Sequence, residues 1–219
     1  MTELFAAVAL FLFFHLLPAI RPLRTGLISR IGRPAYFTIF SAISIAATVL
    51  LFMAYIEAPY VEAWAYQPWA RWTALLVMPV SCILIVVGLA SPNPFSLTLN
   101  ISAFDPFRPG IIGVVRHPAI WGLGLWSAVH MVPNGDAASL TMFGLLTLLS
   151  VSGPRTLTRR RKAAMGEDAW GTLNENMLKP TWIEVIAQTG ALKILGGLAL
   201  YVALLFLHEP VIGMSPLAG

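Results

Sequence analysis

The chain has 219 residues, of which 58% are hydrophobic and only 11% are charged. Soluble domains carry about 25% charged residues, so this composition indicates an integral membrane protein. The net charge of +4 does not indicate nucleic-acid binding, because the basic residues lie in short loops between apolar segments, where they set membrane orientation. The single cysteine, Cys82, excludes an intrachain disulfide and a CxxC metal site.

Apolar segments of helical length predict an all-α, polytopic helical bundle with about six transmembrane helices, forming one domain over residues 1–219. Pro79 should kink the third helix, and Gly153-Pro154 should end the fifth. A loop rich in Pro and Ser separates the third and fourth helices. In chain order, the expected helices cover residues 3–20, 35–56, 72–89, a fourth from between 111 and 118 to 133, 138–152 and 192–207.

The segment 154–190 is the longest polar part of the chain and carries the basic run 159–162. This run is expected to anchor the segment on anionic lipid. Trp170, Leu173 and Met177 recur at helical spacing, so part of the segment is expected to lie as an amphipathic helix on the membrane surface.

Positive charge orients the expected helices. Every Lys and Arg except Arg71 lies in or beside the loops that follow the first, third and fifth helices. The positive-inside rule therefore places these loops in the cytoplasm and both termini on the opposite side. The first apolar segment has no basic region before it, so we interpret it as a retained helix rather than a cleaved signal.

The stretch 116–136 is the expected functional centre, because it places two histidines and two tryptophans in an apolar span. Polar groups inside spans tend to be functional, and neutral imidazole is a common ligand of metals and of haem iron. His15, His117 and His130 are candidate ligands, whereas His208 at a helix end fits an interfacial role.

Three further residues of this stretch have two interpretations each. Trp121 and Trp126 either line a flat cofactor or pack helices together. Arg116 either contacts a cofactor or extends to the lipid headgroups.

Depth along the helices gives one set of histidine pairs. A rise of about 1.5 Å per residue separates His117 from His130 by roughly 20 Å on a continuous helix. Depth alone pairs His15 with His117, and His130 with His208.

A set of short motifs runs through most of the chain, namely His15 followed by Arg24, Arg116-His117-Pro118, Trp121-Gly122, Leu125-Trp126, His130, Asn134-Gly135-Asp136, and Arg161 followed by Gly166-Glu167-Asp168-Ala169-Trp170. In these residues the chain resembles the NnrU family of bacterial membrane proteins, and the resemblance covers roughly residues 5–182. It implies a bacterial inner-membrane protein that acts in denitrification, the reduction of nitrite and nitric oxide, with a respiratory or haem-protein partner.

This family is similar to plant 15-cis-zeta-carotene isomerase, a membrane haem b protein. The resemblance implies that His15 and His130 are the axial ligands of haem b. The residues of the central stretch add His117, Arg116, Trp121 and Trp126 as candidate cofactor contacts. Ser127 stands where the isomerase has a cysteine, and a serine offers no thiolate. The resemblance pairs His15 with His130 whereas depth favours His117, so both pairings stay open, with His130 ranked first.

Other functions stay open as alternatives. One is cis-trans isomerisation of an apolar polyene such as zeta-carotene. Another follows from Arg-His-Pro, which also resembles the isoprenylcysteine and phospholipid methyltransferases that use S-adenosylmethionine. Those enzymes continue with paired glutamates, whereas residues 159–166 here are basic and contain no acidic pair. The non-enzymatic alternative is an assembly factor for a respiratory complex.

Overall fold

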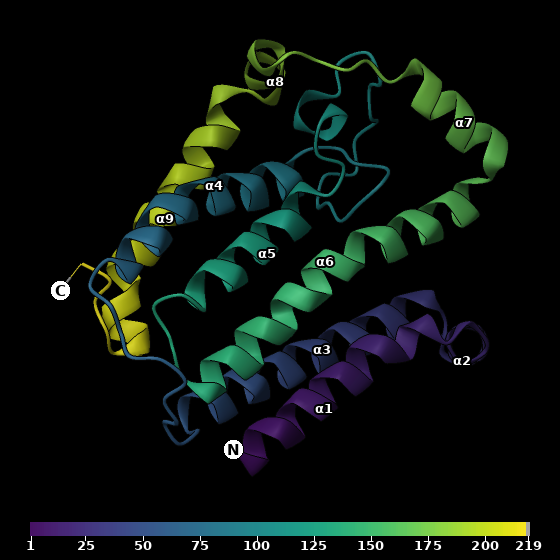
Figure 1. The fold of residues 1–219 in the computed structure, drawn as a ribbon. Coiled ribbons are helices and arrows are strands. Elements are labelled where there is room, and N and C mark those ends of the chain that lie inside the picture. Colours follow the sequence, from purple (N-terminus) through teal and green to yellow (C-terminus); the bar gives the residue numbers. More distant parts are fainter. Residues whose placement is uncertain (218–219) are drawn as a thin grey trace. The chain divides into compact units, whose positions relative to one another are not determined.

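The structure, a computed structural model, describes residues 1–217 and confirms the all-α class over them (Figure 1). It divides into two compact units, the first formed by residues 1–65 with 135–142 and the second by residues 66–134 with 143 onward. In chain order the helices are α1 (Thr2–Leu16), η1 (Leu17–Ala19), α2 (Arg21–Ile31), α3 (Arg33–Ile56), α4 (Ala70–Ala90), η2 (Gly110–Gly113), α5 (Pro118–His130), α6 (Ala137–Met165), α7 (Glu167–Asn176), α8 (Trp182–Thr189) and α9 (Ala191–Ile212).

The helices have the length and composition of a polytopic membrane protein. Among the described residues, α3, α4, α6 and α9 are long and apolar enough to cross a membrane, and α1 is a shorter apolar helix. The hydrocarbon core of a bilayer is about 30 Å thick. With 13 residues, α5 rises only about 20 Å, so this helix is shorter than the core.

In the first unit, α1 packs against α3, with Leu4 and Leu51 fully buried. A helix, α2, occupies residues for which the sequence predicted a loop. Pro22 lies in the first turn of α2, where backbone N–H groups have no helical acceptor in any case. Gly32 ends the helix with a φ of 81°, which glycine adopts without strain. The basic residues of this region therefore lie on a helix rather than in an irregular loop.

In the second unit, glycines bring α5 and α4 into backbone contact. A methyl group added to Gly88 would lie 2.4 Å from the backbone nitrogen of Ala119. One added to Gly122 would lie 2.7 Å from the backbone oxygen of Ser81. The Ser81 hydroxyl donates a hydrogen bond of 2.7 Å to the Gly122 carbonyl. Small residues at such contacts let membrane helices associate through close packing and interhelical hydrogen bonds.

The opposite face of α5 packs against α6 in the same way. A methyl group on Gly124 would lie 2.9 Å from the Ser150 side chain. One turn further along α5, the hydroxyls of Ser127 and Thr147 lie 2.9 Å apart and share a hydrogen bond. Helices α5 and α6 run antiparallel (Figure 1). With α4 bonded to one face and α6 to the other, α5 is held between them.

Pro79 lies inside a continuous α4, at the position where the sequence predicted a helix-distorting proline. A proline has no N–H, so the carbonyl of Leu75, four residues earlier, lacks its helical donor. The hydroxyl of Tyr201 on α9 donates a hydrogen bond of 3.2 Å to that carbonyl. Nearby, a methyl group on Gly197 of α9 would lie 2.5 Å from the Cα of Ile83. The packing of α9 therefore supplies the donor that Pro79 removes.

The prediction that Gly153-Pro154 ends a helix is wrong, because α6 continues through both residues to Met165. A proline removes a single hydrogen bond, and the helix is regular on both sides of it. The actual end is Gly166, which has a φ of 90°. The last helix, α9, likewise contains Pro210 and ends at Gly213, with a φ of 86°.

The segment after α6 packs on the loop that precedes α5. Trp170 of α7 is buried with Phe95 and Ile112, and its ring meets that of Phe95 edge-on at 5.2 Å. Leu173 and Met177 pack against the same cluster. Protein therefore covers the apolar face of α7 that the helical spacing revealed. In contrast, α8 leaves three large apolar side chains exposed, namely Trp182, Ile183 and Ile186.

Replacing Tyr201 with Phe should destabilise the protein by about 1 kcal/mol, because the Leu75 carbonyl would lose its donor without any change in shape. Thermal unfolding in detergent micelles measures this difference. The exposed Tyr60, replaced with Phe in the same way, is the control and should leave the transition unchanged. Equal transitions for both variants would show that the α9 contact does not compensate for Pro79.

Candidate functional site

The structure divides the stretch 116–136 into three parts. His117 precedes the first turn of α5, and His130 is the last residue of that helix. The turn to α6 follows, and it contains Asn134, Gly135 and Asp136. The two histidines therefore lie at opposite ends of α5 and belong to different surroundings.

The ring of His130 is held by its own helix and by two aromatic side chains. Its Nδ1 lies 2.7 Å from the backbone oxygen of Trp126. The rings of Trp126 and Phe143 lie 5.6 Å and 5.3 Å from the His130 ring, centre to centre. Asn134 donates a hydrogen bond of 2.7 Å to the His130 carbonyl, which holds the end of the helix.

This contact assigns the proton positions on His130. A carbonyl oxygen only accepts hydrogen bonds, so Nδ1 carries the proton and donates. In the neutral ring, Nε2 then carries the lone pair. Nε2 has no hydrogen-bond partner within the part of the chain that the structure describes. The Nε2 atom of His130 can therefore donate its electron pair to a metal.

His15, near the end of α1 in the first unit, repeats this arrangement. Its Nδ1 lies 2.8 Å from the backbone oxygen of Phe11, one helical turn earlier. The two rings stack, with centres 4.0 Å apart and an interplanar angle of 29°. Among the described side chains, which do not include those of Ala19 and Arg21, Nε2 of His15 makes no hydrogen bond either. His15 and His130, each within its own unit, therefore have the same tautomer, and in each ring Nε2 makes no hydrogen bond.

The other two histidines differ from this pattern. His117 is only 5% exposed, and its Nε2 lies 2.9 Å from the hydroxyl of Thr158 on α6. Its Nδ1 is buried and has no partner in the described region. His208 makes a hydrogen bond of 2.7 Å from Nδ1 to the backbone oxygen of Met214, beyond the end of α9. His117 therefore connects α5 with α6, and His208 holds the chain that follows α9.

Arg116 connects α7 to the loop before α5. Its guanidinium lies 5.0 Å from the ring centre of Phe95 and 5.9 Å from that of Trp170. One of its nitrogens donates to the side-chain oxygen of Asn174, and its carbonyl accepts a hydrogen bond of 2.9 Å from Asn93. These contacts account for Arg116 without a cofactor.

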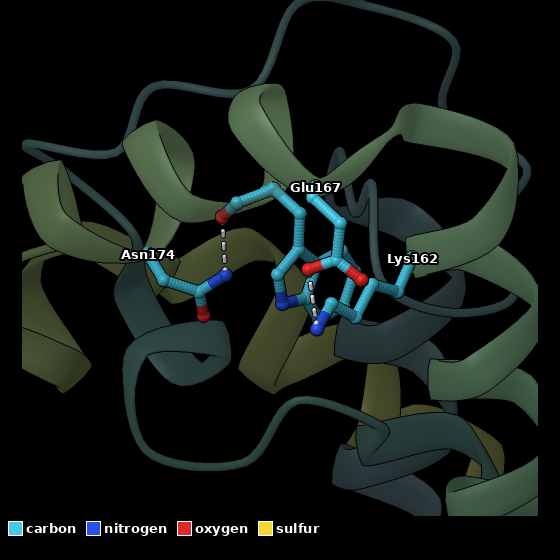
Figure 2. Close-up of polar contacts among 4 residues, drawn as sticks. Lys162, Glu167 and Asn174 are labelled. Carbon is cyan, nitrogen blue, oxygen red and sulfur yellow. Dashed lines mark hydrogen bonds and ion pairs between the residues drawn. The ribbon is translucent and has the colours of Figure 1, made fainter.

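The neighbouring corner between α6 and α7 carries an ion pair of 2.7 Å between Lys162 and Glu167 (Figure 2). Asn174, also drawn in Figure 2, donates from its amide nitrogen to the carbonyl of Trp170, one turn earlier on α7. This bond orients the amide oxygen that accepts from Arg116. The ion pair therefore joins α6 to α7, and the bond within α7 positions Asn174 for Arg116.

The two tryptophans have separate surroundings. Trp126 lies against His130 and packs on the cluster of Met78, Cys82 and Val129. Trp121 is 40% exposed and has no aromatic partner among residues 1–217. Only Trp126 of the two lies beside a candidate ligand.

Phe143 also lies beside His130, and the sequence did not single it out. An aromatic residue in an apolar run has no pattern that distinguishes a ligand contact from ordinary packing. The interlocking of α5 with α6 is what places it there.

Ser127, the serine three residues before His130, is fully buried. Its hydroxyl donates to the Gly124 carbonyl at 3.1 Å and pairs with Thr147 at 2.9 Å. It therefore acts as a packing and hydrogen-bonding residue between α5 and α6.

Gly135 and Asp136 have a structural role in the first unit. The Gly135 carbonyl accepts hydrogen bonds of 2.7 Å and 3.0 Å from the backbone nitrogens of Ala63 and Trp64. A methyl group on Gly135 would lie 2.3 Å from the Trp64 carbonyl oxygen, so only glycine fits. Asp136 accepts from the backbone nitrogen of Ser139 at 2.9 Å, which satisfies the start of α6. This part of the stretch fastens the preceding loop to α6.

A bare metal ion has no obvious site here. The described residues contain no group of three or more His, Cys, Asp or Glu side chains that could hold one. Within its own unit, each of His15 and His130 offers one neutral imidazole nitrogen, and imidazole is a common ligand of iron that a macrocycle already holds.

Comparison with known proteins gives one match. The family model described as NnrU protein matches residues 3–216, nearly the whole chain. No curated protein and no solved structure matches.

Proposed function

Because the chain belongs to the NnrU family, we propose that it is a haem b-binding membrane protein of nitrogen-oxide metabolism, with His15 and His130 as iron ligands. The observation that carries the proposal is the shared state of these two rings. Each donates Nδ1–H to a carbonyl of its own helix and leaves Nε2 free.

This hydrogen bond gives a histidine the properties of an iron ligand. Donation from Nδ1 fixes the tautomer and the ring orientation, and it raises the basicity of Nε2. The aromatic neighbours Phe11 and Phe143 supply apolar surfaces of the kind that pack on a porphyrin. When bound, haem b would supply one-electron chemistry at iron, and a small gas would bind there only in place of one of the two histidines.

His117 is a weaker ligand candidate because of its surroundings. Its Nε2 is engaged with Thr158, and its side chain is almost wholly buried between α5 and α6. A ligand bond through Nε2 would break the contact that joins the two helices. We therefore assign His117 a structural role and keep His130 as the partner of His15.

The proposed location is the bacterial inner membrane, with the basic segments, which include α2 and the end of α6, in the cytoplasm and both termini on the other side. In nitrite and nitric-oxide respiration, a haem protein in this membrane would transfer electrons, sense a gas or handle haem for a respiratory partner. No covalent step is assigned to the chain itself.

Absorption spectra of the purified protein test haem binding most simply. The wild type in detergent should show a Soret band, either as isolated or after addition of haem b. His15→Ala and His130→Ala should each lose or strongly alter the band, because each removes one proposed ligand. His117→Ala is the matched control, a histidine removed from the same helix as His130, and its correctly folded fraction should keep the spectrum.

Two results would contradict the assignment. Well-folded wild-type protein that neither contains nor takes up haem would remove the cofactor. A spectrum that changes with His117→Ala but not with His130→Ala would move the ligand to the other end of α5.

The physiological role needs a test in cells. In a denitrifying bacterium that carries this protein, deletion of its gene should slow the consumption of nitrite or nitric oxide. Wild type should restore the rate, and so should His208→Gln, whereas His130→Ala should not. Full restoration by His130→Ala would point to an assembly factor that works without the proposed ligand.

A further inference from the structure

Arg71 is a basic residue to which the proposed function gives no role. It lies in the first turn of α4, and it is the single Lys or Arg that the sequence places away from the basic loops. Its guanidinium carbon lies 5.4 Å from the ring centre of Trp72. Two of its nitrogens, Nε and Nη1, are buried and make no hydrogen bond in the described part of the chain.

Buried guanidinium nitrogens without a hydrogen-bond acceptor are unfavourable, because the group is always charged and each unpaired donor has lost its hydration. An anion that accepts from the guanidinium offsets part of this cost. Among the described side chains, which leave out that of Arg21, the single ion pair is that of Lys162 with Glu167, so no described carboxylate lies within 4.0 Å of Arg71. The missing acceptor therefore has to come from another molecule or from a rearranged side chain.

The helix register places Arg71 near the end of α5 that carries His130. The antiparallel contact of α4 with α5 runs from Gly88 beside Ala119 to the cluster that joins Val129 with Met78. Ala74 packs against the same cluster, beside Trp126. Arg71 lies one turn before Ala74, roughly 5 Å away along the helix axis. It is therefore at the N-terminal end of α4, the end beside which the antiparallel α5 finishes.

We propose that Arg71 binds a carboxylate of haem b, one of the two propionates, while His130 binds the iron. This inference rests on the proposed function, because it concerns the same site. Trp126 and Phe143, whose rings lie beside His130, would supply apolar contacts to the macrocycle, and Arg71 would supply the cation for its carboxylate. An arginine matches a carboxylate better than a lysine does, since its planar group offers several N–H donors.

Two other anions could meet Arg71, and the test separates them from haem. One is Glu209 on α9, roughly two turns beyond Tyr201, whose contact with Leu75 fixes the register of α9 on α4. The other is the phosphate of an anionic lipid headgroup. With either of these anions at Arg71, the effect of replacing Arg71 would not depend on the carboxylates of haem.

The experiment titrates haem b and its dimethyl ester into haem-free full-length protein in detergent. The ester keeps the iron and the ring but has no carboxylate charge. Arg71→Gln should weaken binding of haem b by about tenfold or more, the effect of one charge-assisted hydrogen bond. Arg71→Lys should bind more tightly than Arg71→Gln. The exposed Arg155, replaced with Gln, is the control and should leave haem affinity unchanged.

The ester titration shows whether the effect of Arg71 depends on the carboxylate. Wild type should bind the ester more weakly than haem b, whereas Arg71→Gln should bind both equally. The midpoint potential of haem b in Arg71→Gln should also be lower than in wild type, because a nearby positive charge favours the reduced iron.

Several outcomes would overturn the inference. Wild-type protein that binds no haem refutes the proposed function itself. Wild type that binds haem while Arg71→Gln has the same affinity and potential refutes only the role of Arg71. If Arg71→Gln lowers the affinity for haem b and for the ester by the same factor relative to wild type, the substitution has caused a structural defect. A phosphatidylglycerol molecule lost from Arg71→Gln in native mass spectrometry, with haem affinity unchanged, assigns the site to lipid. Weakening by Glu209→Gln that matches Arg71→Gln assigns an internal ion pair.

Discussion

Close packing of α5 between α4 and α6 is the constraint on which the rest of the second unit depends. At Gly122 the backbone of α5 touches α4, and at Gly124 a side chain of α6 takes the space that a Cβ would need. Ser81 adds a hydrogen bond to an α5 carbonyl on one side, and Ser127 adds one to α6 on the other. A short helix is thereby fixed in depth and rotation by its neighbours. Its two terminal histidines are consequently held in defined and different surroundings.

That fixed position explains how one helix separates a structural histidine from a candidate ligand. At the start of α5, His117 is buried against Thr158 and serves the contact with α6. At the end, His130 turns its Nδ1 back to the Trp126 carbonyl and lies among aromatic rings. The same backbone hydrogen bond occurs at His15 on α1. The likeness of these two rings, rather than the number of histidines, distinguishes the pair.

Apolar runs predicted the all-α class and most of the long helices, because lipid-facing residues leave a clear composition signal. They did not predict α2, whose basic residues resemble a loop, nor the continuation of α6 through Pro154, since a single lost hydrogen bond does not end a helix. At the candidate site, residue type singled out His15, His117 and His130, and the family resemblance ranked the pair of His15 and His130 first, which stays a prediction. Phe143 and the unpaired nitrogens of Arg71 could not be predicted, because they depend on which helices pack together.

Electron paramagnetic resonance of the oxidised, haem-loaded protein tests the central claim most directly, because the spin state of ferric iron reports its axial ligands. Two imidazoles from His15 and His130 predict a six-coordinate, low-spin spectrum. Replacing either histidine with alanine should convert the signal to high spin. A high-spin spectrum in the folded wild-type protein, or a low-spin spectrum that persists in both alanine variants, would contradict the account.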